Sequence, residues 1–274
     1  MGHLKYTEFY SEFANDYDSM TKDSSRWAKV QGTYIKLFGD LLPERILDAG
    51  CGSGGEMVAL SKLGITCFGV DGSAEMIDQA RQKAIHSGSN AEFLVDDISE
   101  LSKIENGSVD LVICRGNTLP HLRISDSLGS AFSAFSRVTR SGGRLVLQWL
   151  NYDMILKDKK RLVGVSGDNN EVFTRFYDFI SSEEVVFNLL IQNYDEKWKS
   201  KWISTPLTPW TSDTVLDTLK RNGWQDVDEL SACGNVSITE VRDQKTWNLV
   251  ATDQEIINAW NALILDFPIE RLNL

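Results

Sequence analysis

A glycine-rich segment near residue 50 has the composition of a turn that binds a ligand through its backbone. The segment is LDAGCGSGG (residues 47–55), in which Gly50, Gly52 and Gly55 fit the spacing G-x-G-x-x-G. Because glycine lacks a Cβ atom, such a turn can bend sharply into a helix and approach a ligand closely. The pattern alone fits a dinucleotide as well as another adenosine-containing cofactor, so neighbouring residues must separate these alternatives.

Carboxylates stand at or after the ends of three successive apolar stretches, and each is placed to meet one part of a cationic nucleoside. Asp48 stands two residues before the first glycine, where it would repel a pyrophosphate and attract a cationic group. Asp71 can accept hydrogen bonds from both hydroxyls of a ribose, a contact that dinucleotide enzymes also make. Asp97 can bind the exocyclic amine of adenine, while Ile98 offers the ring an apolar face. Together these positions favour a cationic nucleoside over a dinucleotide.

These residues need parallel strands whose carboxyl ends meet at one edge of a sheet. Short apolar stretches alternate with segments of helical periodicity, and the connections between them are short. This alternation is typical of an α/β fold with helices on both faces of the sheet. We therefore predict a doubly wound, mostly parallel sheet. Its strands are predicted at 45–48, 66–71, 92–95, 109–114 and 144–149, with helices at 55–63, 73–87 and 126–140 and a turn at 141–143.

The remaining segments are predicted to add lid helices, a cap and the end of the sheet. Residues 1–44 contain two helices, one with aromatic residues from Tyr6 to Tyr17 and one at 25–42. Residues 45–150 form the cofactor-binding core, and residues 151–208 form a small antiparallel β cap with three strands between 165 and 205. Residues 209–274 complete the core with a helix at 212–222, strands at 226–231 and 246–251, and a final helix from 254.

The composition argues against several classes of partner. The formal net charge is −11, which disfavours nucleic acid and anionic membranes. The four cysteines and three histidines show no zinc-binding spacing, and no apolar run approaches the roughly 20 residues that a membrane span needs. The first residues lack the layout of a signal peptide. We therefore expect a cytoplasmic protein without a metal, a nucleic-acid partner or a membrane partner.

Five ordered segments resemble the class I S-adenosylmethionine-dependent methyltransferases. They are LDAGCGSGG (47–55), GVDGSAEMI (69–77), FLVDDISEL (93–101), VDLVICRGNTLPHL (109–122) and SGGRLVLQ (141–148). The resemblance implies S-adenosylmethionine as the cofactor and a seven-stranded sheet whose last two strands form a hairpin. It also implies cofactor contacts by matched position: Gly50 and Gly52 along the methionine part, Asp48 on the ammonium through water, Asp71 on the ribose, Met76, Asp97 and Ile98 around the adenine, and the backbone of Arg115 along the pocket.

Two segments are similar to the glycine and sarcosine N-methyltransferases, namely CRGNTLPHL (114–122) and NYDMIL (151–156). The similarity implies that Tyr17 and Arg26 close on the cofactor carboxylate; the alternatives are a core aromatic residue and a solvated arginine. It also implies that Asn117 contacts the substrate, although a turn residue would explain this asparagine as well. Asn151 in the second segment is a further substrate candidate.

One position departs from those enzymes. They bind the substrate carboxylate with an arginine directly before the NYD segment, where this chain has Leu150. A leucine cannot pair with a carboxylate, whereas Arg175 in the cap could replace that arginine unless it is an exposed strand residue. His121 is the one residue near the predicted site that titrates close to neutral pH, and it is either a base or a helix-start residue.

The predicted function is transfer of a methyl group from the sulfonium to a small-molecule acceptor, most simply an amine. Such a displacement depends on the alignment of donor and acceptor, so we expect no dedicated catalytic residue. Aromatic residues of the cap either roof the acceptor pocket or form the core of the cap: Phe173, Phe176, Tyr177, Phe179, Trp198 and Trp202. An NAD-dependent oxidoreductase and a non-catalytic S-adenosylmethionine-binding protein are the alternatives, and the sequence leaves the acceptor and the oligomeric state open.

Overall fold

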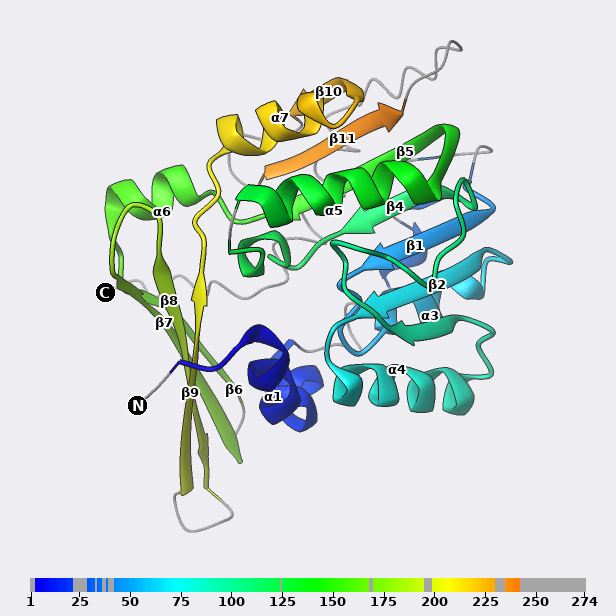
Figure 1. The fold of residues 1–274 in the computed structure, drawn as a ribbon. Coiled ribbons are helices and arrows are strands. Elements are labelled where there is room, and N and C mark those ends of the chain that lie inside the picture. Colours follow the sequence, from blue (N-terminus) through cyan, green and yellow to red (C-terminus); the bar gives the residue numbers. More distant parts are fainter. Residues whose placement is uncertain are drawn as a thin grey trace.

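Two β-sheets and one intervening helix organise the part of the chain that the structure describes (Figure 1). The computed structural model describes residues 3–21, 29–32, 34, 35, 38, 42–123, 125–167, 170–194, 199–229 and 235–241. The larger sheet has the strand order β10-β11-β5-β4-β1-β2-β3, and the smaller has the order β6-β7-β8-β9. Helix α1 (Tyr6–Thr21) lies between the two sheets.

Five parallel strands form most of the larger sheet, as the α/β pattern predicts. They are β1 (Arg45–Ala49), β2 (Thr66–Asp71), β3 (Glu92–Val95), β4 (Val109–Cys114) and β5 (Thr139–Trp149). Strand β1 lies centrally, and its Asp48 is in register with Gly69 of β2 and Ile113 of β4. The segments that follow these strands therefore meet at one edge of the sheet, where α/β folds bind their ligands.

Helices cover both faces of this sheet. Helices α3 (Gly55–Ser61) and α4 (Ala74–Ser87) pack on one face, and α5 (Ser125–Val138) and α7 (Ser212–Arg221) pack on the other (Figure 1). Successive residues of β1 serve the two faces, since Ile46 packs with the α3 and α4 side and Leu47 with the α5 side. The helices predicted between the strands and at 212–222 are thereby confirmed. None of the described helices is long and apolar enough to cross a bilayer.

Strand β5 begins earlier than predicted. It includes residues 141–143, which the sequence analysis assigned to a turn. Gly142 has a φ of +72°, and the pairing of β5 with β4 shifts register between Val109 and Leu111. The two glycines therefore mark an irregular stretch within a strand and not a turn before it.

The far edge of the larger sheet is antiparallel. Strand β11 (Asn235–Val241) pairs with β5, and β10 (Trp224–Glu229) pairs with β11. Strand β10 confirms the strand predicted at 226–231 with a shift of two residues, whereas β11 was not predicted. The strand predicted at 246–251, the helix predicted from 254 and most of the helix predicted at 25–42 lie outside the described residues.

The cap is an antiparallel sheet of four strands, so the predicted number of three is wrong. The strands are β6 (Leu162–Gly167), β7 (Glu171–Phe179), β8 (Val185–Asn193) and β9 (Lys199–Leu207). Strand β6 was not predicted because Gly164 and Gly167 interrupt its alternating pattern. Helix α6 (Tyr152–Asp158) connects β5 to this sheet.

Helix α1 contacts the cap and the core through different sides. Phe9 and Phe13 pack with residues of the cap, among them Phe173 of β7. On its other side, Asp18 forms an ion pair with Lys83 of α4 at 2.8 Å and accepts a hydrogen bond from Ser53 at 2.5 Å. Helix α1 therefore covers the carboxyl edge of the parallel strands and connects it with the cap (Figure 1).

Candidate cofactor and acceptor site

The turn after β1 presents glycine backbone to the space below α1. Gly50 and Gly52 have φ values of +94° and +52°, a region of backbone conformation that favours glycine. A Cβ atom at Gly50 would lie 2.5 Å from Cγ2 of Thr118, and one at Gly52 would lie 3.4 Å from the hydroxyl of Tyr17. The Gly50 amide donates to the Val70 carbonyl at 2.7 Å, which fixes the turn to the end of β2.

Asp71, the last residue of β2, binds this turn. Its carboxylate accepts hydrogen bonds from the amides of Gly52 and Ser73, each at 2.9 Å. Burial raises the pKa of Asp71, while these backbone donors act in the opposite direction. A carboxylate offers about four lone-pair sites, so its oxygens can still accept two ligand hydroxyls. The geometry is compatible with the predicted contact to a ribose.

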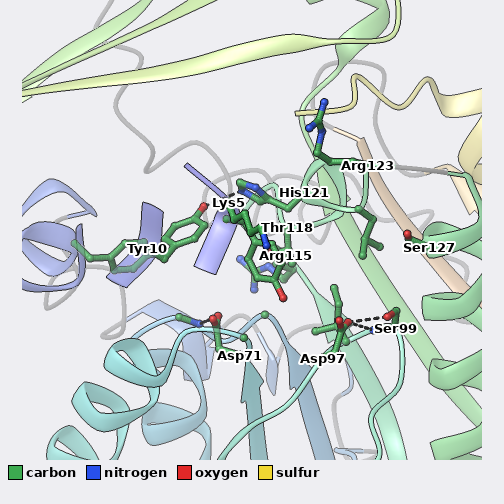
Figure 2. Close-up of a pocket in the computed structure, with 18 residues that line it drawn as sticks. Lys5, Tyr10, Asp71, Asp97, Ser99, Arg115, Thr118, His121, Arg123 and Ser127 are labelled. Carbon is green, nitrogen blue, oxygen red and sulfur yellow. Dashed lines mark hydrogen bonds between the residues drawn. The ribbon is translucent and has the colours of Figure 1, made fainter. Parts of the chain in front are cut away.

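A cavity of about 740 Å³ lies between the carboxyl edge of the sheet and α1. Its floor, as we call it below, consists of Gly50, Gly52, Asp71, Asp97 and Ile98. The carboxylates of Asp71 and Asp97 lie on the same side of the cavity (Figure 2). The volume is in the range that accommodates a cofactor-sized ligand. The sequence predicted all five floor residues as neighbours, and their contacts with the cofactor stay predictions.

Helix α1 contributes three tyrosines to the opposite wall, which we call the roof: Tyr6, Tyr10 and Tyr17. Residues three, four or seven apart share one side of a helix, and the three tyrosines follow that spacing. The phenylalanines Phe9 and Phe13 face the cap instead. Only Tyr17 was predicted as a site residue. The tyrosines and the phenylalanines lie on separate sides of the helix, and this separation could have identified Tyr6 and Tyr10 as well.

His121 meets the roof from the end of the 3-10 helix η2 (Leu119–His121). Its Nε2 atom lies 3.2 Å from the Tyr10 hydroxyl, and Figure 2 shows the two side chains pointing toward each other. Its Nδ1 atom is buried and has no hydrogen-bond partner among the described residues. Burial lowers the pKa of His121 to about 4 and raises the pKa of Tyr10, so both side chains are neutral at pH 7. An imidazole with that pKa is a weak base, which argues against the base alternative.

Arg115 follows β4 and lines the cavity, and its predicted backbone contact with the cofactor stays a prediction. Its carbonyl accepts a hydrogen bond from the Thr118 hydroxyl at 2.7 Å. The amide of the next residue, Gly116, donates to the side chain of Gln148 at 2.7 Å. These bonds fix the loop after β4, whereas the guanidinium is directed to Glu56, to which it donates at 2.5 Å.

Three residues predicted to contact the cofactor do not contribute to the described cavity wall. Asp48 is 6% exposed and does not line the cavity. Met76 is fully buried in the first turn of α4, where its amide donates to the Ser73 hydroxyl at 3.3 Å. Arg26 lies outside the described residues. Contacts of Asp48 and Met76 with the cofactor therefore stay predictions that the cavity wall does not support.

Asn117 joins two strand ends. Its Nδ2 atom donates to the Tyr152 hydroxyl at 2.9 Å, and its Oδ1 atom accepts from the Leu150 amide at 3.1 Å. Its φ of +66° is uncommon for a residue with a side chain and typical of an asparagine in a turn. The structure favours the turn alternative for Asn117, and its substrate contact stays a prediction.

The other two substrate candidates also lie away from the cavity wall. Asn151 caps α6 by accepting a hydrogen bond from the Met154 amide at 3.1 Å. Arg175 is 4% exposed on the inner side of β7, 3.5 Å from the Ser166 hydroxyl, so the exposed-arginine alternative is wrong. Burial lowers the pKa of Arg175, and the neighbouring Tyr177 acts in the opposite direction.

Known proteins match the core of the chain. A family model described as a methyltransferase domain matches residues 46–143. A glycine/sarcosine N-methyltransferase of Aphanothece halophytica is 26% identical over 174 residues, which are 62% of this chain and 66% of that protein. A ubiquinone biosynthesis O-methyltransferase of Xanthomonas oryzae pv. oryzae is 27% identical over 54% of this chain and 62% of that protein. The chain thus spans about two thirds or less of the curated relatives that it matches.

Solved structures share the fold. An S-adenosylmethionine-dependent methyltransferase from Clostridium acetobutylicum has a TM-score of 0.68 at 19% identity, over 85% of this chain and 99% of that chain. Together these matches support a class I S-adenosylmethionine-dependent methyltransferase. They likewise support the predicted cofactor S-adenosylmethionine, which supplies a methyl group on a sulfonium when bound. The methyltransferase CalS10 from Micromonospora echinaspora, whose structure holds this cofactor, has a TM-score of 0.58 at 15% identity over 88% of this chain and 100% of that chain.

The cavity of this methyltransferase fits its cofactor. The glycine turn allows a close backbone approach, and the acids Asp71 and Asp97 favour a cationic ligand over a diphosphate. The described residues contain no group of three or more histidine, cysteine, aspartate or glutamate side chains placed to hold a metal ion.

Proposed function

We propose that this chain transfers the methyl group of S-adenosylmethionine to a small-molecule acceptor, most simply to an amine nitrogen. The observation that carries the proposal is the cavity of about 740 Å³ between acidic floor and tyrosine roof. A covered cavity of this size suits a cofactor with a small acceptor. The net charge of −11 disfavours nucleic acid as the acceptor.

Each part of the cofactor has a candidate partner in the cavity. Gly52 approaches the methionine part, and the hydroxyl of Tyr17 beside it binds the cofactor carboxylate. Asp71 accepts the ribose hydroxyls, whereas Asp97 and Ile98 bind the amine and the ring of adenine. A hydrogen bond to a charged group contributes about 1.5–3 kcal/mol, so Asp71 and Asp97 supply much of the binding free energy.

The transfer itself requires alignment more than acid or base catalysis. Holding donor and acceptor in line contributes as much as roughly 7–11 kcal/mol to the lowering of the barrier. An amine must lose its proton before it attacks, and water accepts that proton, because His121 is a weak base. The similarity of the CRGNTLPHL and NYDMIL segments to N-methyltransferases favours nitrogen over oxygen as the attacking atom.

A carboxylate on the acceptor would be recognised from the cap. Leu150 cannot bind it, whereas Arg175, although it does not line the described cavity, supplies a buried guanidinium on the inner side of β7. A guanidinium binds a carboxylate through two parallel hydrogen bonds, and burial strengthens such a pair. Asn117, Asn151 and His121 are the further candidates for acceptor contacts.

Release of S-adenosylhomocysteine from a panel of acceptors tests the proposed activity. The panel contains glycine and sarcosine, the corresponding amines without a carboxylate, and small phenols. We expect turnover of at least one amine. Turnover of phenols alone would assign the chain to O-methylation, and cofactor binding without any turnover would favour a non-catalytic role. Calorimetry that detected NAD binding and no S-adenosylhomocysteine binding would refute the proposal.

The variant Arg175→Gln tests the carboxylate site. We expect KM for a carboxylated amine to rise about ten- to hundredfold, because a charged hydrogen bond worth about 1.5–3 kcal/mol is lost. KM for methylamine should stay nearly constant. The matched control is Arg161→Gln, which removes a largely exposed guanidinium of the cap that pairs with Asp178. An equal KM increase for both amines would show that Arg175 does not read the carboxylate.

A further inference from the structure

Arg115 places a cationic side chain at the cavity that binds a cationic cofactor. It follows β4 directly and lines the cavity, yet its whole residue is only 5% exposed. A guanidinium directed into this cavity would repel the sulfonium, because charges interact strongly where water is excluded. The direction of this side chain therefore affects how the site discriminates between ligands.

Glu56, which does not line the cavity, binds the guanidinium of Arg115. Nη1 of Arg115 donates to Oε1 of Glu56 at 2.5 Å, and the hydroxyl of Tyr34 donates to the same oxygen at 2.9 Å. The side chains of Glu56 and Arg115 are only 6% and 4% exposed, so the ion pair is buried. Glu56 lies in the first turn of α3, directly after the glycine turn, and does not line the cavity.

The charge of Arg115 persists in this environment. Burial acts to lower the pKa of Arg115, but Glu56, Tyr34 and Asp48 raise it above its ordinary value. The guanidinium therefore keeps its positive charge beside Glu56, and Asp48 adds a carboxylate nearby. Removing one member leaves a buried charge without its compensating partner, which is costly and scarcely screened by salt.

We propose that Glu56 compensates the charge of the Arg115 guanidinium and thereby prevents it from selectively weakening the binding of the cationic methyl donor relative to the neutral product. S-adenosylmethionine carries one positive charge more than S-adenosylhomocysteine, at the sulfur atom. A change in the buried charge therefore alters the affinities for the two ligands unequally, whereas a loss of packing weakens both alike. The inference rests on the proposed cofactor site and assigns Glu56 and Arg115 as positioning residues.

Calorimetric Kd values for both ligands test the inference through their ratio. For Glu56→Gln, the uncompensated guanidinium should raise Kd(S-adenosylmethionine)/Kd(S-adenosylhomocysteine) about tenfold. For Arg115→Met, the uncompensated carboxylate should lower the same ratio. The double variant removes one charge of each sign, and its ratio should return to within about twofold of the wild-type ratio.

Two further variants separate charge from folding. Glu56→Asp keeps the charge, so the ratio should hold even if the thermal midpoint falls. Asp110→Asn removes the partner of Arg140 at the other end of β4 and should leave the ratio unchanged. If Glu56→Gln does not fold, Arg115→Met and the double variant decide the outcome.

Equal weakening of both ligands in Glu56→Gln and Arg115→Met, with no change in the ratio, would overturn the inference. Wild-type protein that bound neither ligand would instead refute the proposed function, so the two failures are distinguishable.

Discussion

The floor of the cavity and the inner side of the cap are built in different ways. Asp71 ends β2, and Asp97 lies two residues after the end of β3, so the parallel sheet brings them to one edge. Arg175 and Phe173 instead share one side of β7, and contact with α1 decides which side of the cap is buried. The floor therefore depends on short local segments, whereas the inner side of the cap depends on packing between distant segments.

The largest expected effect concerns the packing of the cap. Phe173 is 1% exposed and lies 6.5 Å from the ring of Phe13 in α1, measured between ring centroids. We expect Phe173→Ala to lower the free energy of unfolding by about 3–5 kcal/mol in urea denaturation. The control Phe176→Ala alters the same strand on its other side, where the ring contacts the half-exposed Trp202, and should cost less than half as much. Equal losses would contradict the assignment of the inner side.

The next largest effect concerns the cofactor side. Asp71→Ala removes the acceptor for two backbone amides and for the ribose, so S-adenosylhomocysteine should bind about a hundredfold more weakly in calorimetry. The control is Asp96→Ala, because Asp96 does not line the cavity and accepts a hydrogen bond from the Lys103 amide at 2.9 Å. Its affinity should stay within about threefold of wild type. A normal affinity in Asp71→Ala would remove the local basis of the cofactor site.

The smallest effect is the pH dependence of stability caused by His121, which lies at the end of η2 beside the roof. Burial lowers the pKa of His121 from 6.5 to about 4, so the folded state excludes a proton that the unfolded chain takes up. This contribution favours the folded state above pH 6.5 and is lost as the pH falls toward 4. We expect wild-type protein to lose about 1–2 kcal/mol of stability over that interval relative to His121→Gln. Parallel pH profiles of the unfolding free energy for the two proteins would show that His121 titrates normally.

The parallel core was predictable because its signals are local. Alternation of apolar and helical segments gave β1 to β4 and the helices between them, with Ser73 as the cap of α4. The floor residues were predictable from the same segments. The carboxyl ends of parallel strands lie at one edge of the sheet, so a glycine turn or an acid that follows such a strand must lie at that edge.

The errors arose where local patterns were weak or misleading. Strand β6, for example, contains two glycines that interrupt its alternation. Asn117 matched a substrate residue by position, yet its amide group bonds to Tyr152 and to the Leu150 backbone. The hydrogen-bond partner of a side chain depends on which distant segment packs beside it, and spacing along the chain does not report this.

The sequence by itself determined the α/β core, the family and the residues of the cavity floor, because each of these depends on neighbours along the chain. Only the tertiary structure decided that Tyr6 and Tyr10 roof the cavity, that Arg175 is buried, and that the Arg115 guanidinium pairs with Glu56. These outcomes depend on pairs of residues far apart in the sequence, such as Tyr10 with His121. Burial and charge act through space, so they become defined once the chain has packed.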